Sequence, residues 1–182
     1  MRKLVVLIAL LGLFSLPLMA QDTPKAEVFG GYQYTHITIN TTVAGTSINK
    51  GFNFNGWNAS VTGNFNKYFG VAADFSGDYK SISGVNTNIY TYTFGPVVSL
   101  NHEGTVNPFV HALFGGVHAG AGQSGVGVSS NGFAMLAGGG VDAKVAPHIA
   151  VRLAQFDWFY YHVQGLSESK NVRISTGIVF RF

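Results

Sequence analysis

Residues 56–65 read GWNASVTGNF, and their side chains alternate strictly between two kinds. Asn58, Ser60, Thr62 and Asn64 form a wholly polar set. The residues that alternate with them are apolar or small, namely Trp57, Ala59, Val61, Gly63 and Phe65. Successive side chains of a β-strand point to opposite faces, so this period of two predicts a strand with one apolar and one polar face.

The same alternation recurs in residues 71–79 and again in residues 172–182 at the end of the chain. In the first of these, Asp74, Ser76 and Asp78 oppose apolar or small residues. In the second, Arg173, Ser175 and Arg181 lie on the face opposite Ile174, Ile178 and Phe180. A soluble β-sandwich has the same period, so the alternation predicts strands without identifying their environment.

The composition is that of a membrane protein. Only 10% of the residues are charged, against about 25% in typical soluble domains. Hydrophobic residues make up 47% of the chain, and there are 24 glycines. After residue 20, however, no run approaches the roughly 20 apolar residues that a transmembrane helix needs. Because every backbone polar group must be satisfied inside lipid, a closed β-barrel is the remaining structure.

The first residues have the pattern of a secretory signal peptide. Arg2 and Lys3 precede an apolar run over residues 4–14, and Ala20 offers a small residue for cleavage. We therefore expect residues 1–20 to be a signal peptide and residues 21–182 to be a single barrel domain. Without Arg2 and Lys3, the 11 basic residues become 9, against 8 acidic ones, and this charge of +1 implies no nucleic-acid partner. With no cysteine in the chain, disulfides and thiol chemistry are excluded.

The alternating segments predict an all-β fold: an eight-stranded antiparallel up-and-down transmembrane β-barrel. The strands are expected at about 26–37, 54–65, 69–79, 89–100, 108–118, 132–144, 149–161 and 171–182. The joins after the second, fourth and sixth strands are short. The other joins are longer and rich in Gly, Ser, Thr and Asn; they cover residues 38–53, 80–88, 119–131 and 162–170.

This regular sorting of the joins favours a membrane barrel over a sandwich. Outer-membrane barrels have short periplasmic turns and longer outer loops, whereas a sandwich has no reason to sort its loops in this way. Both ends of the barrel domain are then expected on the periplasmic side. Ten strands remain an alternative, if the first or the last long loop contains a further hairpin.

Aromatic residues gather at the ends of the expected strands. Tyrosine and tryptophan prefer the headgroup region of a bilayer, so these residues are expected to form two girdles. The predicted girdle residues are Tyr32, Tyr34, Trp57, Tyr68, Tyr79, Tyr90, Tyr92, Trp158 and Tyr160, together with Phe69 and Phe182.

The last residues, 176–182, read TGIVFRF and resemble the C-terminal signal that the barrel assembly machinery of Gram-negative bacteria recognises. Its matching positions are Thr176, Gly177, Phe180 and Phe182. With residues 54–77 and the size of the domain, the chain is similar to small outer-membrane proteins of the OmpA/OmpX-like porin superfamily. The resemblance implies a monomer in the bacterial outer membrane, in contact with outer-membrane lipids and lipopolysaccharide, and inserted by the assembly machinery.

Charged residues on the polar faces are expected inside the barrel. They are Glu27, Asp74, Asp142, Arg152 and Arg173. An eight-stranded barrel is just wide enough for side chains to fill its interior, and buried charges must be paired, which predicts a plug of Arg–carboxylate bridges. A narrow path for ions is the alternative. Asp157 and Arg152 are an odd number of positions apart, so a regular strand would put their side chains on opposite faces. Either a bulge turns Asp157 inward or it lies at the rim.

No motif points to a catalytic, cofactor or metal site. Residues 120–125 fit G-x-G-x-x-G, but the next residues, VGVSSNGF, have poor helix propensity, so no phosphate-binding helix is expected. The six histidines lack metal-ligand spacing, and His111 and His118 should lie on opposite faces of one strand. Barrel lipid A deacylases use a histidine and a serine two residues apart on one strand. No histidine of this chain has a serine two residues after it.

These observations predict a non-enzymatic outer-membrane barrel with a structural or surface-interaction role in the cell envelope. A narrow porin-like channel for ions or small solutes is the first alternative. A lipid A-modifying barrel enzyme is the second, since a serine, a histidine and an acid could still meet across strands.

Overall fold

The computed structural model describes residues 24–182 except positions 44–45, 83–84, 103, 124–125 and 164–165. The expected signal peptide and its cleavage site lie outside the described residues. Eight strands follow one another along the chain: β1 (Ala26–Val43), β2 (Thr46–Asn64), β3 (Phe69–Ile82), β4 (Val85–Ser99), β5 (Val106–Gln123), β6 (Val126–Ala146), β7 (Ile149–Val163) and β8 (Leu166–Arg181). No helix among the described residues is long and apolar enough to cross a membrane.

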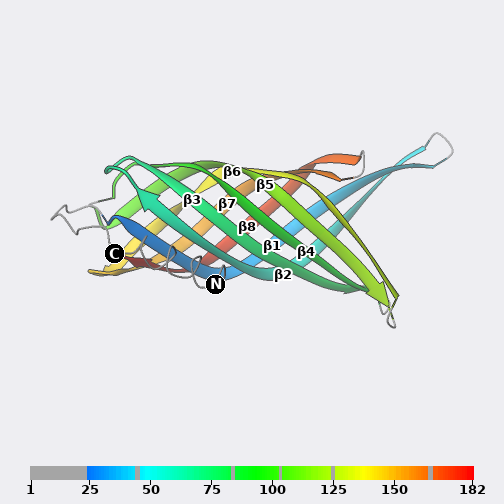
Figure 1. Ribbon diagram of the computed structural model, residues 1–182, viewed down its shortest axis with the longest axis horizontal. Coiled ribbons are helices and arrows are strands. Elements are labelled where there is room, and N and C mark those ends of the chain that lie inside the picture. The colour runs from blue at the N-terminus through cyan, green and yellow to red at the C-terminus, as the bar shows by residue number, and fades with distance from the viewer. Residues whose placement is uncertain (1–23, 44–45, 83–84, 103, 124–125, 164–165) are drawn as a thin grey trace, which may run out of the picture.

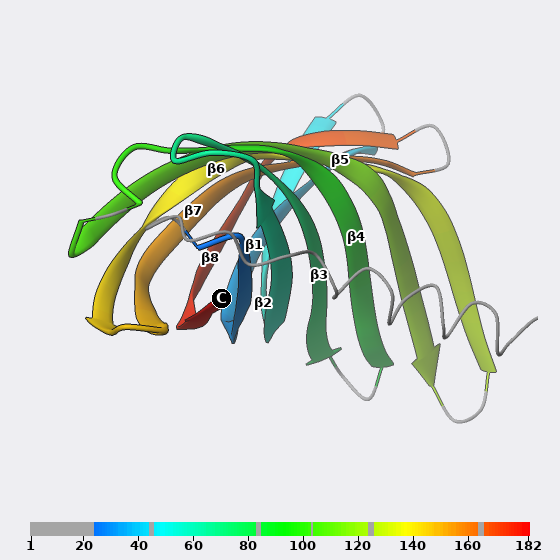
Figure 2. The ribbon, with the colours of Figure 1, turned by 60° about the vertical axis from the view of Figure 1, so that its left-hand side comes forward.

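The strands form one closed antiparallel barrel in sequence order, as expected (Figures 1 and 2). Closure is made by β1 and β8, which pair from Glu27 opposite Arg181 to His36 opposite Val172. The main-chain N–H of Lys25 also donates to the carbonyl of Phe182, 2.7 Å away. All strands of such a barrel have two neighbours over the closed part, so no sheet edge is left to lipid there.

The connections fall into two classes that lie at opposite ends of the barrel (Figure 1). One end carries the turns at residues 65–68, 100–105 and 147–148, together with the described ends of β1 and β8. We call it the turn end. The other end, here called the hairpin end, carries the joins β1–β2, β3–β4, β5–β6 and β7–β8. The rule for outer-membrane barrels predicts that the turn end is periplasmic and that the hairpin end faces outward.

The structure corrects the expectation of long loops at the hairpin end. Most of residues 38–53, 80–88, 119–131 and 162–170 continue the strands as paired hairpins instead of forming loops. Thr38 pairs with Gly51, and Val43 still pairs with Thr46, close to the tip. The β1 part of this segment is rich in Thr, Ile and Val, which favour strands, so the ladder continues beyond the lipid. The expected ten-strand alternative does not arise, since each hairpin lengthens two strands of the eight.

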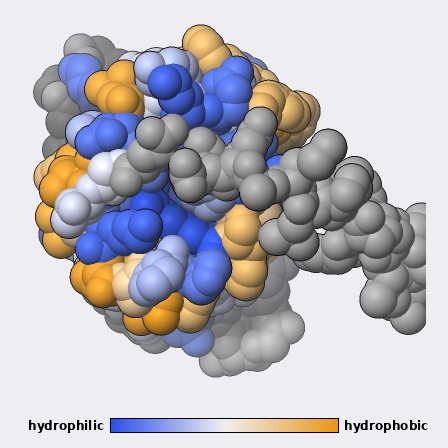
Figure 3. All heavy atoms as spheres, turned by 90° about the vertical axis from the view of Figure 1, so that its left-hand side faces the viewer, coloured by the Kyte–Doolittle hydropathy of each residue, from blue (hydrophilic) through white to orange (hydrophobic). Residues whose placement is uncertain are grey.

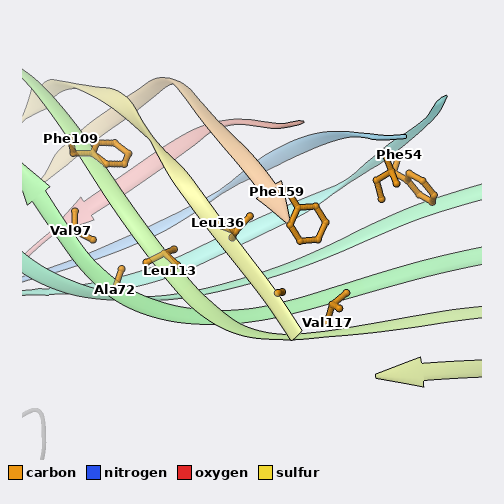
Figure 4. Packing of buried hydrophobic residues seen from close by; sticks show 10 residues of the cluster. Phe54, Ala72, Val97, Phe109, Leu113, Val117, Leu136 and Phe159 are labelled. Carbon is orange, nitrogen blue, oxygen red and sulfur yellow. The ribbon is translucent and has the colours of Figure 1, made fainter. Parts of the chain in front are cut away.

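A layer of apolar side chains lies inside the barrel, which the sequence analysis did not expect. Its buried members are Ile37, Phe54, Ala72, Val97, Phe109, Leu113, Val117, Ala134, Leu136 and Phe159. Figure 4 shows the labelled side chains of this cluster pointing into the space that the strands enclose. Phe52, Ile89, Tyr161 and Val163 pack against it and are partly buried. The interior is therefore polar on some strands and apolar on others.

Candidate functional site

The interior of the barrel collects the acidic side chains and the arginines of the described residues. The six described Asp and Glu side chains are all buried: Glu27, Asp74, Asp78, Asp142, Asp157 and Glu168. The three described arginines, Arg152, Arg173 and Arg181, are buried as well. The described lysines are exposed or half-buried. Charges held away from water need partners, and the arginines supply them.

Arg173 of β8 lies at the centre of this interior. Its Nη1 donates to Oδ1 of Asp74 on β3 at 2.8 Å, and its Nε donates to Oδ2 of Asp157 on β7 at 2.8 Å. Asp157 also lies 2.8 Å from Nε2 of His111 and accepts from the side-chain amide of Gln155 at 2.7 Å. One guanidinium therefore ties the neighbouring strands β7 and β8 to β3 in another part of the barrel wall.

Arg152 of β7 makes a second ion pair nearer the turn end. Its Nε and Nη2 donate to the two oxygens of Asp142 on β6, at 2.8 and 3.1 Å. Its guanidinium carbon lies 4.3 Å from the ring centre of Phe29 and 4.4 Å from that of Phe109. A bidentate carboxylate and two aromatic faces fix the planar group on all sides, which a lysine could not reproduce.

A third pair, at the turn end itself, joins Arg181 to Glu27 across the β1–β8 seam. Arg181 Nε lies 3.0 Å from Oε1 of Glu27, and Nε2 of His102 lies 3.5 Å from the same oxygen. His102 comes from the turn after β4 and reaches over the barrel mouth. Figure 3 views this end and shows hydrophilic residues at its centre with hydrophobic residues around the rim.

Asp78 is satisfied by neutral groups. It accepts from the amide of Gln33 at 2.8 Å and from the hydroxyl of Thr35 at 2.9 Å. On the neighbouring strands, the hydroxyls of Ser76 and Thr91 lie 2.5 Å apart. The charged groups and these neutral groups form one polar face of the interior, and the apolar cluster occupies the rest.

The facing of Asp157 is settled by a bulge in β7. Arg152 pairs with Gly177 on β8 and Gln155 pairs with Ser175, so three steps on β7 match two on β8. The same irregularity appears toward β6, where Val141 pairs with Ala154 and Asp142 with Arg152. The extra residue reverses the parity after Arg152, and Asp157 therefore points inward beside Arg173.

Little space remains in the interior of the barrel toward the turn end. A cavity of about 20 Å³ lies there, lined among others by Glu27, Asp74, His111, Asp142, Arg152 and Gln155. Since a water molecule needs roughly 10–15 Å³ of such space, the cavity has room for about one. The neutral polar side chains of Asn58, Ser60, Thr62, Thr91 and Thr93 are buried in the interior, and Asn64 is half-buried.

The structure places the five charged residues expected in the interior on its inner face. Four of them form the ion pairs Arg152–Asp142 and Arg173–Asp74, whereas Glu27 pairs with Arg181. Sequence reasoning left the facing of Asp157 open between a bulge and the rim, and it missed Asp78, Arg181, His102, His111, Gln33 and Gln155 as members of the network. Asp78 and Arg181 lie on polar faces that alternation already marked, so the signal was there. His102 lies in a turn, and His111 faces inward among apolar residues, so periodicity gave no sign of their partners.

The aromatic residues of the expected girdles lie on the outer face. Tyr32, Trp57, Tyr68, Tyr79, Tyr92 and Trp158 are exposed, whereas Tyr34, Tyr90 and Tyr160 are half-buried. Several contact one another: the Trp57 indole N–H donates to the Tyr79 hydroxyl at 3.2 Å, and the Tyr79 and Tyr90 rings meet edge to face. Tyr68 lies at the turn end with Phe69 and Phe182.

The residues of the C-terminal signal lie at the seam of the barrel. Thr176 donates its hydroxyl to the carbonyl of Arg152 at 2.8 Å, and Gly177 pairs with Gly31. Phe180 and Phe182 are exposed on the outer face. The rings are therefore presented to the surroundings of the barrel while their backbone closes it.

The remaining motifs carry no site among the described residues. Gly120 to Gln123 belong to β5, and Gly122 pairs with Gly127 of β6, so the glycine motif is hairpin and not a helix-capping loop. Within the described part of the chain, no group of three or more His, Cys, Asp or Glu side chains could hold a metal ion. His111 faces inward and His118 outward, as expected; the latter bonds Asn131.

Solved structures of small outer-membrane barrels resemble this fold. The attachment invasion locus protein Ail of Yersinia pestis has a TM-score of 0.62 at 19% identity, over 88% of this chain and 99% of Ail. Neisserial surface protein A gives 0.66 at 16% identity, over 85% of this chain and 97% of that one. OprG of Pseudomonas aeruginosa gives 0.55 at 10% identity, over 88% and 96%. The comparison with curated proteins gave no match.

These likenesses concern the fold, and a family model covers nearly the whole chain. The model of the outer membrane protein beta-barrel domain matches residues 6–182. The match agrees with the closed eight-stranded barrel and with the apolar outer face. The chain belongs to the outer membrane protein beta-barrel domain family and is a protein of the bacterial outer membrane.

Proposed function

We propose that this protein is a non-conducting and non-enzymatic barrel with a structural or surface-interaction role in the cell envelope. The observation that carries the proposal is the filled interior. Arg173, Asp74 and Asp157 tie β8, β3 and β7 together across the lumen with contacts of 2.7–2.8 Å. A water path through the polar face would have to break these bridges, and each broken bridge would leave a buried charge without its partner.

The apolar layer supports the same conclusion. Phe54, Val117 and Phe159 are buried inside the barrel, and they lie nearer the hairpin end than Arg173's partner Asp74 does. An ion that avoided the polar face would meet these apolar side chains, where it has no ligand. The polar network and the apolar cluster therefore fill the lumen side by side, which favours a plug over a gate.

The role in the envelope would then rest on the outer surface. The paired hairpins extend the wall beyond the aromatic residues and give the outer end an ordered shape. Following the family resemblance, we propose that the protein is a monomer that contacts outer-membrane lipids and lipopolysaccharide, and that the barrel assembly machinery inserts it. We also propose cleavage after Ala20, so that the mature chain begins at Gln21; the mass of the mature protein tests this.

Single-channel recording of the refolded protein in a planar bilayer tests the central claim. We expect no discrete openings from protein that runs faster on a detergent gel before boiling than after, which shows that it is folded. A Phe54→Ala, Phe159→Ala double variant is the matched positive case, because it thins the apolar layer and keeps the ion network. Reproducible openings of the unaltered protein would reject the proposal.

A narrow channel is the second candidate, and the polar cavity of about 20 Å³ favours it. Its lining carries both charge signs, with Asp74, Asp142 and Arg152 as the groups that would select ions. Discrete openings whose selectivity changes in an Asp142→Asn variant would establish this function. The small volume and the apolar layer are the reasons why it stands second.

One observation bears on the hypothesis that the protein is a lipid A-modifying enzyme. Nδ1 of His162 lies 2.6 Å from the hydroxyl of Ser167, so a serine and a histidine do meet across β7 and β8. The same cross-strand geometry recurs at His36 with Asn53 and at His118 with Asn131, where the partner is no nucleophile. Cross-strand pairing therefore accounts for the contact, and unchanged lipid A masses in cells expressing the protein are expected.

A further inference from the structure

Charge is sorted between the two faces of the barrel wall. Each of the six described carboxylates is buried, and so is each arginine. Lys50, Lys67, Lys144 and Lys170 are exposed. The exposed surface of the described residues therefore carries lysine side chains and no side-chain carboxylate, and the α-carboxylate of Phe182 lies at the turn end. Toward the hairpin end, a surface of this kind attracts anionic partners.

Three histidines lie on the outer face toward the hairpin end, each bonded to a residue directly opposite it. Nδ1 of His36 lies 2.6 Å from Oδ1 of Asn53, and Nδ1 of His118 lies 2.7 Å from Oδ1 of Asn131. His162 makes the corresponding contact to Ser167. The pairs belong to the hairpins β1–β2, β5–β6 and β7–β8, so the arrangement recurs around the barrel.

These histidines lie at the level of the aromatic girdle or one step beyond it. His36 follows Tyr34 on the outer face of β1, and His162 follows Trp158 and Tyr160 on that of β7. His118 lies opposite Tyr90 of β4. Tyrosine and tryptophan mark the headgroup zone of a bilayer, so the histidines are placed where lipid headgroups lie.

One sector adds a permanent positive charge. Lys170 lies on β8, whose two neighbours are β7, which carries His162, and β1, which carries His36. Lys170 is on the same outer face of β8 as Val172, and Val172 pairs with His36. Ser169 and Lys170 are both exposed, because a register shift occurs here between β7 and β8. Below them, the rings of Trp158 and Tyr160 are stacked with centres 6.2 Å apart, and the Trp158 indole donates to the carbonyl of Ser169.

The local packing holds the His36 ring in a defined position. A Cβ built on Gly51 would lie 2.8 Å from Cε1 of His36, so the ring occupies space that only glycine leaves at that position. With Nδ1 donating to Asn53, Nε2 remains for another partner. It can accept from a hydroxyl when the ring is neutral and donate to a phosphate oxygen when the ring is protonated.

We propose that the sector formed by His36, His162 and Lys170 binds the phosphate-bearing headgroup of a lipid in the outer leaflet. Lys170 supplies the charge, the imidazoles supply directional hydrogen bonds, and the aromatic pair beneath supports the start of the acyl region. The inference rests on the proposed contact with lipopolysaccharide and goes beyond it by naming the residues of the site and the phosphate group that they recognise. A silent barrel that fails to bind lipid would reject this inference alone.

Native mass spectrometry of the folded protein in a non-ionic detergent tests the site. The probes are phosphorylated lipid A and the same lipid after removal of its phosphates. The sector variant is His36→Gln, His162→Gln, Lys170→Gln. The matched control removes three cationic or ionisable groups at the turn end, as Lys67→Gln, Lys144→Gln, His148→Gln. Lys170→Gln alone serves if the triple variant does not fold, as judged by gel mobility.

The sector variant is expected to bind phosphorylated lipid A about fivefold more weakly or worse, since a basic residue near a membrane surface contributes about that much, while the control keeps its binding. Equal losses in both variants, or equal binding of lipid with and without phosphate, would overturn the proposal. So would complete displacement of the lipid by inorganic phosphate at the same concentration, because the site would then recognise the free anion.

Discussion

Arg173 and Asp74 are 99 residues apart in the chain, and their side chains meet inside the barrel with 2.8 Å between Nη1 and Oδ1. β8 and β3 are not neighbours in the wall. The ion pair, together with Asp157 of β7, therefore acts as a brace across the lumen, which hydrogen bonds between adjacent strands cannot supply.

Removing the guanidinium should destabilise the barrel strongly. Arg173→Met leaves Asp74 and Asp157 buried without their shared cation, and breaking a buried pair in this way costs about 3–5 kcal/mol. Urea unfolding of the refolded protein in detergent measures the loss. Lys170→Met on the same strand is the control, because Lys170 is exposed. A loss no larger than that of the control would mean that the brace contributes little.

Neutralising the whole brace should recover much of that loss. In an Arg173→Met, Asp74→Asn, Asp157→Asn variant no unpaired charge remains, so we expect it to be more stable than Arg173→Met alone. The same urea unfolding experiment measures the difference. If the triple variant is the less stable of the two, the hydrogen bonds of the carboxylates to Asn58 and Gln155 outweigh the cost of their charge.

The sequence predicted the barrel because a membrane barrel shows its inner and outer faces directly in the period of two. It also predicted that Asp74, Asp142, Arg152 and Arg173 face inward. The partner of each group could not be predicted, since Arg173 reaches strands far away in the chain. Asp157 was ambiguous because a bulge reverses parity without any marker in the sequence. The inner position of Phe54 and Phe159 was missed because apolar residues on a lumen face resemble a lipid-facing row.

Thinning the apolar layer should create a leak without unfolding the barrel. Phe159 is 2% exposed and Phe54 is 5% exposed, and truncating a buried Phe to Ala costs about 3–5 kcal/mol. We expect small conductance steps from Phe54→Ala, Phe159→Ala protein that still shifts on a gel. Phe94→Ala, which removes an exposed ring from the outer face, is the control and should stay silent. Silence from both variants would place the barrier in the ion network alone.

Phe182 should matter for assembly more than for stability. Its ring is 63% exposed, while its backbone N–H donates to Ala26 at 2.8 Å. Phe182→Ser therefore keeps the closing backbone bonds. Refolding in detergent is expected to be nearly normal, and the amount of folded protein in outer membranes of expressing cells to fall severalfold. Phe65→Ser, which removes another exposed ring at the turn end, is the control. Equal yields for both variants would argue against a role of Phe182 in recognition.

Two adjacent glycines of β1 should respond in opposite ways to the same change. A Cβ on Gly31 would lie 2.1 Å from the carbonyl oxygen of Thr176 on β8, whereas a Cβ on Gly30 would meet nothing within 4 Å. Gly31→Ala must push β1 away from β8 at the seam, and such overpacking costs about 1–3 kcal/mol or more. Gly30→Ala should be neutral or slightly stabilising, because it lowers the entropy of the unfolded chain. Urea midpoints of the two variants decide the matter. A similar loss in both would mean that any side chain here disturbs the strand, whereas a loss at Gly31 alone shows that the close approach of β1 and β8 closes the barrel.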